Sequence, residues 1–225
     1  MRNAATYRRA VASAGLALTA VLMATAMGMG VPFSGAGVLA AMSDAGDRAW
    51  LSATTYLLAQ LAMIPAALGL AHLLRQQAPA LSNLGATLMV LGAFGHTVHG
   101  GSVLLTIQMA ADQTHHSTHA AVLDAFASSP AGIFSLMGLL GTVLGLIMLT
   151  VGIWRVRLGP RWVAPALAAF IVLEFVGAAI SPIAGLVAGA FYVAAFVTLA
   201  HTARRSPTES WGLVTETREP QRVAP

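Results

Sequence analysis

The sequence is marked first by what it lacks. It has 225 residues, none of which is cysteine or lysine, and only 9% are charged, whereas soluble domains carry about 25% charged residues. The absence of cysteine excludes disulfides, thiolate nucleophiles and cysteine-based zinc or iron–sulfur sites. Walker A, His-Glu-x-x-His and Gly-x-Ser-x-Gly sequences do not occur either. The common nucleotide-binding and hydrolase signatures are therefore missing.

More than half of the sequence is apolar. Apolar residues make up 57% of the chain, and the mean hydropathy is +0.75, which is typical of a membrane protein. All basic residues are arginine, and alanine and glycine are abundant, a composition that favours a GC-rich bacterial genome. We therefore expect an integral protein of the bacterial inner (plasma) membrane.

Six apolar stretches are long enough to cross a bilayer, whose core of ~30 Å needs about 20 helical residues. They cover residues 11–30, 49–74, 81–109, 131–154, 162–180 and 183–202. The sequence thus predicts an all-α protein, a single six-span bundle over residues 1–205. The polar segment 206–225 predicts a disordered cytoplasmic tail.

The first stretch has an alternative interpretation as a cleaved signal peptide. It follows a basic start, and residues 24–26 read Ala-Thr-Ala, as in a cleavage site. We favour a retained span, because the apolar run is long for a signal peptide and the topology of the other stretches works best with it in place.

Arginines mark alternate ends of the six stretches. Those at one end are Arg2, Arg8, Arg9, Arg75, Arg155, Arg157, Arg161, Arg204 and Arg205. The opposite ends hold Arg48 as their only basic residue. Because cytoplasmic loops carry the excess of basic residues, this pattern predicts a multi-pass protein with both termini in the cytoplasm.

The same pattern accounts for the formal charge of +4, so we do not expect nucleic acid as a partner. The expected partner is the lipid bilayer, with a membrane-protein partner or a second copy of the chain as a further expectation.

Small residues predict close packing between helices. The fourth stretch contains Gly141-x-x-x-Gly145 and the sixth contains Gly185-x-x-x-Gly189, spacings that let two helices approach closely. Gly92 lies on one helical face of the third stretch together with other small residues. These faces indicate a tightly packed bundle.

Polar side chains within the apolar stretches predict a cluster inside the membrane. Its candidate members are Tyr56, Gln60, His96, His99, Glu174 and Tyr192. Glu174 is the only acidic residue within a stretch, and burying it is costly unless it is neutral or paired. From the rise per residue, Glu174 and His96 lie at similar depths, ~18 and ~22 Å from the cytoplasmic ends of their helices. The cluster is either a ligand or proton site built on Glu174 and His96, or a structural hydrogen bond between two helices.

His96 and His99 also invite a haem interpretation, which we do not favour. Residues three apart share a helical face, so they cannot ligate one iron from opposite sides. A histidine at matching depth on another stretch is missing. We therefore expect no cofactor.

The segment between the third and fourth stretches offers candidate metal ligands. Asp112, His115, His116 and His119 include two pairs spaced four residues apart. If this segment is helical, either pair could bind Zn²⁺ or Cu²⁺ outside the membrane. The alternative, which we favour, is a solvated loop.

The chain resembles small, uncharacterised six-span bacterial membrane proteins of unknown function. The resemblance lies in overall length, in the loop before the fourth stretch, and in the hairpin that runs from Gly138 through Gly-Ile-Trp-Arg (152–155) to Gly-Pro-Arg (159–161). It implies a membrane bundle, but it carries no catalytic residue over to this chain.

These observations favour a non-enzymatic integral membrane protein that binds a small apolar ligand or serves as a membrane accessory subunit. The alternative is a small transporter or proton-coupled carrier that uses Glu174 and His96. A third hypothesis is a metal- or haem-dependent membrane enzyme.

Overall fold

The computed structural model describes residues 2–35, 37–177 and 180–212, and these residues form helices and no strand. The α-helices are α1 Arg2–Gly28, α2 Val38–Ala45, α3 Asp47–Leu74, α4 Pro79–Ala111, α5 His116–Ala127, α6 Gly132–Val156, α7 Val163–Val172 and α8 Pro182–Arg205. Shorter turns are η1 Gln113–His115, the π-helical segment η2 Leu173–Gly177, and η3 Thr208–Trp211. Five helices (α1, α3, α4, α6 and α8) are long and apolar enough to cross a membrane.

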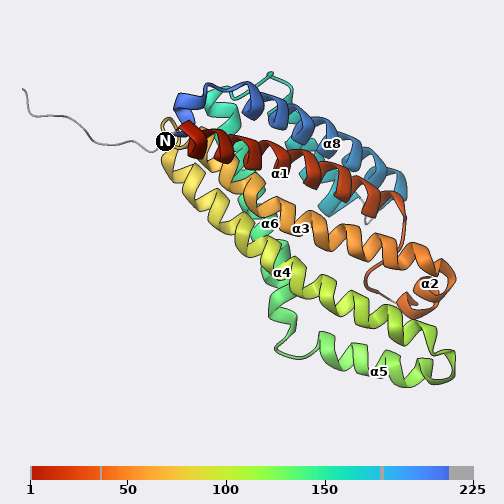
Figure 1. The fold of residues 1–225 in the computed structure, drawn as a ribbon. Coiled ribbons are helices and arrows are strands. Elements are labelled where there is room, and N and C mark those ends of the chain that lie inside the picture. The colour runs from red at the N-terminus through yellow and green to blue at the C-terminus, as the bar shows by residue number, and fades with distance from the viewer. Residues whose placement is uncertain (1, 36, 178–179, 213–225) are drawn as a thin grey trace, which may run out of the picture.

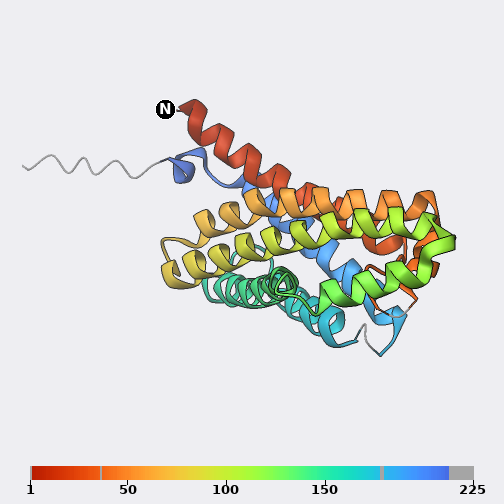
Figure 2. The ribbon, with the colours of Figure 1, turned by 90° about the horizontal axis from the view of Figure 1, so that it is seen from below.

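Six helices pack in a closed ring. Each neighbouring pair is in contact in the order α1, α3, α4, α6, α7, α8 and back to α1, and Figures 1 and 2 show the long members running side by side. The helices α2 and α5 lie outside the ring, against α4. All six helices of the ring contribute side chains to one shared core.

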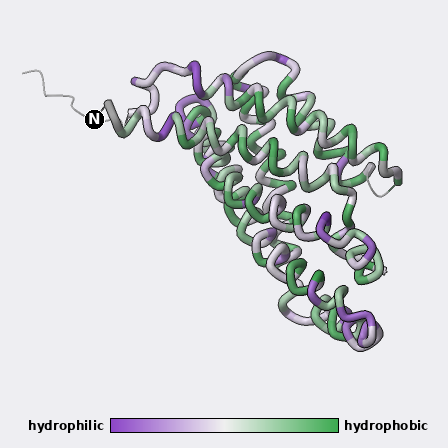
Figure 3. Tube along the Cα trace, turned by 45° about the vertical axis from the view of Figure 1, so that its right-hand side comes forward, coloured by the Kyte–Doolittle hydropathy of each residue, from purple (hydrophilic) through white to green (hydrophobic). Residues whose placement is uncertain are grey.

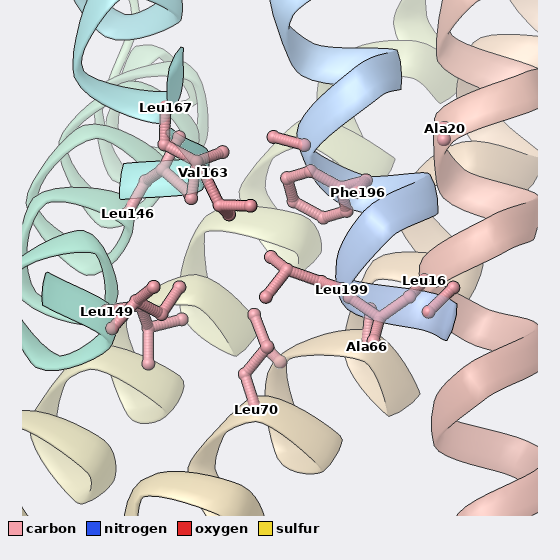
Figure 4. Packing of buried hydrophobic residues seen from close by; sticks show 14 of the residues in the cluster. Leu16, Ala20, Ala66, Leu70, Leu146, Leu149, Val163, Leu167, Phe196 and Leu199 are labelled. Atoms are coloured by element: carbon pink, nitrogen blue, oxygen red, sulfur yellow. The ribbon is translucent and has the colours of Figure 1, made fainter. Parts of the chain in front are cut away.

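The core lies between the helices, and apolar side chains also cover the outside. Leu16, Leu70, Leu149 and Leu167 are at most 2% exposed and interdigitate in the core (Figure 4). Large apolar side chains such as Leu61 face outward on the long helices. Figure 3 shows apolar residues along the length of the bundle, with hydrophilic residues gathered towards its ends. An apolar exterior of this extent suits lipid rather than water.

Glycines bring α4 and α6 into backbone contact, as the small-residue faces predicted. A methyl group at Gly92 would stand 2.5 Å from the backbone nitrogen of Thr142, and one at Gly141 would stand 2.6 Å from that of Gly92. Any side chain at these positions would force the helices apart. The approach is looser at Gly189, where a methyl group would meet the side chain of Met27 at 3.7 Å, an ordinary contact distance.

The C-terminal segment folds back onto the basic end of the bundle. Trp211 is 1% exposed, and its ring stacks on His72 with centroids 4.5 Å apart. Arg8 donates to the carbonyl of Trp211, and Arg75 donates to the carbonyl of Ser210. The expectation of a disordered tail from residue 206 is therefore wrong for residues 206–212, because a buried tryptophan and arginine hydrogen bonds fix them. Residues 213–225 lie outside the described residues.

Two further expectations are corrected. Most of the loop expected between the third and fourth stretches is the helix α5. The fifth stretch, expected over 162–180, is shorter, because α7 has 10 residues and the π-helical η2 adds 5. At about 1.5 Å per residue this segment reaches roughly 22 Å, less than the ~30 Å core of a bilayer. Residues 178–179 of that stretch lie outside the described residues.

Candidate functional site: a cavity inside the helical ring

A partly open cavity of about 180 Å³ lies between the helices of the ring. All six helices of the ring, with η2, contribute to its wall. The lining residues are Met23, Met27, Tyr56, Gln60, Met63, Met89, His96, Thr142, Leu146, Phe170, Glu174, Phe175, Tyr192 and Phe196. Pockets for drug-sized ligands measure roughly 300–1,000 Å³, so this cavity suits a smaller molecule.

The structure brings most of the predicted polar cluster into this one cavity. The members that line it are Tyr56, Gln60, His96, Glu174 and Tyr192. They come from α3, α4, η2 and α8, so residues far apart in sequence meet at one place. His99, the remaining predicted member, does not line the cavity.

Tyr56 and His96 form a hydrogen-bonded pair across the α3–α4 interface. The Tyr56 hydroxyl lies 2.7 Å from Nδ1 of His96, and the two rings meet edge to face with centroids 5.9 Å apart. The ring of Tyr56 also meets the ring of Phe33 edge to face, with centroids 5.2 Å apart. The pair fixes the orientation of the imidazole, and with one nitrogen engaged His96 has only its other ring nitrogen for a ligand.

A second hydrogen-bonded chain anchors Tyr192. The hydroxyl of Thr19 donates to the carbonyl of Ala59 at 3.1 Å, and it also lies 3.1 Å from the hydroxyl of Tyr192. Because a hydroxyl has one hydrogen to donate, Tyr192 is the donor to Thr19. The Tyr192 oxygen therefore keeps its own acceptor capacity. This chain links α1, α3 and α8 beside the cavity.

Glu174 is positioned by an irregular stretch of helix. It lies in η2, where the α7 helix widens to π-helical geometry, and such segments are frequent at functional sites. Its Oε2 atom is buried without a hydrogen-bond partner among the described residues. No hydrogen bond joins Glu174 to His96 there, since the recorded partner of that imidazole is Tyr56. The structural hydrogen bond that was the alternative for these two residues is thus not formed.

Gln60 gives the cavity another polar group without a protein partner. Its side chain is buried at 3% exposure, and in the described part of the chain no hydrogen bond to it is recorded. An amide offers two donors and an acceptor oxygen. Gln60 and Glu174 can therefore both serve a ligand without breaking an existing bond.

The rest of the cavity wall is apolar and adaptable. Methionines from α1, α3 and α4 line it, and aromatic rings line the side formed by α7 and α8. Phe170 and Phe196 flank Tyr192, with ring centroids 4.8 and 4.2 Å from it. Methionine and aromatic side chains suit apolar ligands of varied shape. Sequence reasoning missed these residues, because methionine and phenylalanine within an apolar stretch look the same whether they face lipid or a cavity.

The candidate metal ligands outside the bundle form a hydrogen-bonded cluster instead. Oδ2 of Asp112 lies 2.9 Å from Nδ1 of His115 and 3.4 Å from Nε2 of His119. Hydrogen bonds from Thr114 and then from His115 hold the pKa of the Asp112 carboxyl well below its usual range. His116 turns away and donates to the carbonyl of Ala110 at 3.0 Å. Within the described residues no group of three such ligands could hold a metal ion.

Comparisons of the chain with protein-family models, with curated proteins and with solved structures gave no match.

Proposed function

We propose that this protein binds a small, largely apolar molecule that carries a hydrogen-bond donor, and that it holds this molecule inside the bilayer in the cavity of the helical ring. The observation that carries the proposal is the carboxyl of Glu174, a residue of the cavity wall whose buried Oε2 atom has no hydrogen-bond partner within the described residues. Leaving such an atom without a partner costs free energy, and a donor group on a bound ligand removes that cost.

The composition of the wall defines the ligand further. Aromatic and methionine side chains favour an apolar body, whereas Glu174 favours a donor or a cationic group at one end. A small lipophilic amine has both features. The cavity favours ligand binding over a purely accessory role, because a subunit that serves only to pack against a partner needs no internal space.

We place this site in a six-span protein with both termini in the cytoplasm. Five of the six spans are helices whose length and hydropathy suit a membrane crossing. The shorter α7–η2 segment is the sixth span in this proposal, because it completes the ring between α6 and α8. The positive-inside rule assigns the arginine-rich end to the cytoplasm.

The test compares two molecules of the same shape. Binding of 2-phenylethylamine should raise the unfolding temperature of the purified protein in detergent, since a ligand that binds only the folded state stabilises it. Propylbenzene, which lacks the donor, should have a smaller effect. The substitution Glu174→Leu should remove the difference between the two molecules.

The matched control is His99→Leu, which removes a polar side chain from the same part of the bundle but not from the cavity wall. It should leave the preference for the amine intact. Equal shifts with both molecules in the native protein, or a preference that survives Glu174→Leu, would contradict the proposal.

A proton-coupled carrier is a second use of the same cavity, and the π-helical segment favours it. Irregular helices commonly carry the substrate sites of membrane carriers, and Glu174 lies on such a segment. The two functions differ in whether the ligand crosses the membrane. Uptake of 2-phenylethylamine into proteoliposomes, driven by a pH gradient and lost in Glu174→Leu, would favour the carrier; binding without uptake would favour the ligand-binding protein.

A further inference from the structure

A second pocket lies at the turn between α6 and α7, at the arginine-rich end of the bundle. It measures about 230 Å³, and the guanidinium-bearing residues Arg157 and Arg161 line it together with the apolar Ile153 and Ala164 and the indole of Trp154. At this turn a methyl group on Gly159 would stand 3.2 Å from the hydroxyl of Thr202, near the end of α8. The pocket therefore combines two cations with an apolar wall.

The two arginines of this pocket have no partner within the described residues. Arg157 and Arg161 are both exposed, and in the described part of the chain no hydrogen bond or ion pair is recorded for either side chain. No acidic residue occurs between Asp124 and Glu174. Other arginines at this end are engaged; Arg9, for example, donates to the carbonyl of Ser206 at 3.0 Å. The guanidinium groups of the pocket are thus available to an anion.

The backbone at Arg157 points to a specific need for this side chain. Arg157 caps α6 with φ 56° and ψ 42°, and it is the only non-glycine residue with positive φ in the described part of the chain. Glycine is the residue that this left-handed position normally favours. A side chain kept at an unfavourable backbone conformation is an observation that supports a functional role.

The surroundings favour an anion that carries apolar chains. Ala164 belongs to the first turn of α7, where the helix dipole favours negative charge. Trp154, which lines the pocket, is 63% exposed, and Trp162, the residue after Arg161, is 46% exposed. Exposed tryptophan is typical of the membrane–water interface. A free inorganic anion would use the arginines and leave the apolar wall unused.

We infer that this pocket binds the phosphodiester headgroup of an anionic phospholipid, with Arg157 and Arg161 on the phosphate and the apolar wall against the first part of the lipid chains. Arginine forms bidentate bonds with phosphate, and basic pockets between membrane helices are suited to anionic headgroups. The site is independent of the central cavity and of its proposed ligand.

Native mass spectrometry of the full chain, released from detergent after incubation with either phosphatidylglycerol or phosphatidylcholine, tests the inference. We expect the native protein to retain phosphatidylglycerol in preference to phosphatidylcholine. Arg157→Gly and Arg161→Gln should each weaken this retention about tenfold, as expected for the loss of a charge-assisted hydrogen bond. Arg157→Gly should fold at least as well as the native chain, because glycine suits the backbone at that position.

The matched control is Arg155→Gln, which removes the same charge from the last turn of α6, next to the pocket but not in its lining. It should retain phosphatidylglycerol as the native chain does. An equal loss in Arg155→Gln would overturn the inference in favour of general surface charge. Unchanged retention in the two pocket variants would overturn it as well. Loss of the bound lipid from both the native protein and the Arg155→Gln protein on addition of inorganic phosphate would also overturn it, because the site would then bind a free anion.

Discussion

At the residue level, the side chains of Tyr56 and His96 each satisfy a hydrogen-bonding group of the other. Their hydrogen bond of 2.7 Å is formed between partly buried side chains, where the loss of one partner leaves the other with an unmet hydrogen-bonding need. The pair also sets which nitrogen of His96 is left for a ligand. A change that removes only the hydroxyl therefore tests structure and site together.

The substitution Tyr56→Phe should destabilise the folded protein by about 1–2 kcal/mol, because it leaves Nδ1 of His96 without its partner while keeping the ring contacts. The measurement is reversible unfolding in mixed detergent, followed by circular dichroism. Tyr7→Phe is the matched control, since Tyr7 is 70% exposed, and it should change stability little. Equal effects of the two substitutions would show that the hydrogen bond does not contribute.

Sequence reasoning anticipated the cavity residues only in part, and the reason is geometric. The rise per residue gives the depth of a side chain along its helix, so it could bring Glu174 and His96 to a similar level. It does not give the rotation of each helix about its axis. His96 and His99 share a helical face, yet only His96 reaches the cavity, because a small cavity admits only a narrow part of that face.

At the scale of elements, the contact between α4 and α6 decides how the ring closes. Gly141 lies against the backbone of α4, where a methyl group would stand 2.6 Å from the nitrogen of Gly92 and 2.7 Å from the carbonyl oxygen of Leu88. Backbone cannot move aside as a flexible side chain can. This contact therefore depends on the absence of a side chain.

The substitution Gly141→Ala should destabilise the protein by about 1–3 kcal/mol through overpacking, despite the higher helix propensity of alanine. Gly101→Ala is the matched control on α4, because a methyl group at Gly101 would meet nothing within 4 Å. That control should be neutral or stabilising by up to about 1 kcal/mol. The measurement is the unfolding temperature in detergent. A stable Gly141→Ala protein would mean that the helices separate at little cost.

Some elements left a readable pattern in the sequence and others did not. The spacing of Gly141 and Gly145 predicted a close contact correctly, whereas a methyl group at Gly189 would meet only the side chain of Met27, at 3.7 Å, since the pattern does not say what lies opposite. The segment that forms α5 was expected as a loop because it is polar. The helix has no buried residue, and a helix without a buried face leaves no apolar periodicity in the sequence. The π-helical η2 leaves no pattern at all.

At the scale of the whole molecule, the ring brings both ends of the described chain together. Arg8 and Arg9 near the start of α1 donate to carbonyls of Trp211 and Ser206 after α8, and Figure 1 shows α8 ending beside the start of α1. A chain that starts and ends on the same side of a membrane crosses it an even number of times. The short α7–η2 segment therefore decides the topology: if it crosses, six spans return the chain to its starting side, and if it does not, five spans leave the end on the opposite side.

The absence of cysteine allows the number of membrane crossings to be tested by labelling, because a single introduced cysteine is the only target for a thiol reagent. Thr118→Cys on α5 and Glu209→Cys in η3 both introduce an exposed thiol. In intact cells a membrane-impermeant maleimide should label Thr118→Cys, whereas Glu209→Cys should be labelled only after permeabilisation. Labelling of both variants in intact cells would exclude the six-span topology, because α6, α7–η2 and α8 between the two positions would then cross the membrane an even number of times. Labelling of Glu209→Cys alone would mean that the bundle is inverted, against the positive-inside rule.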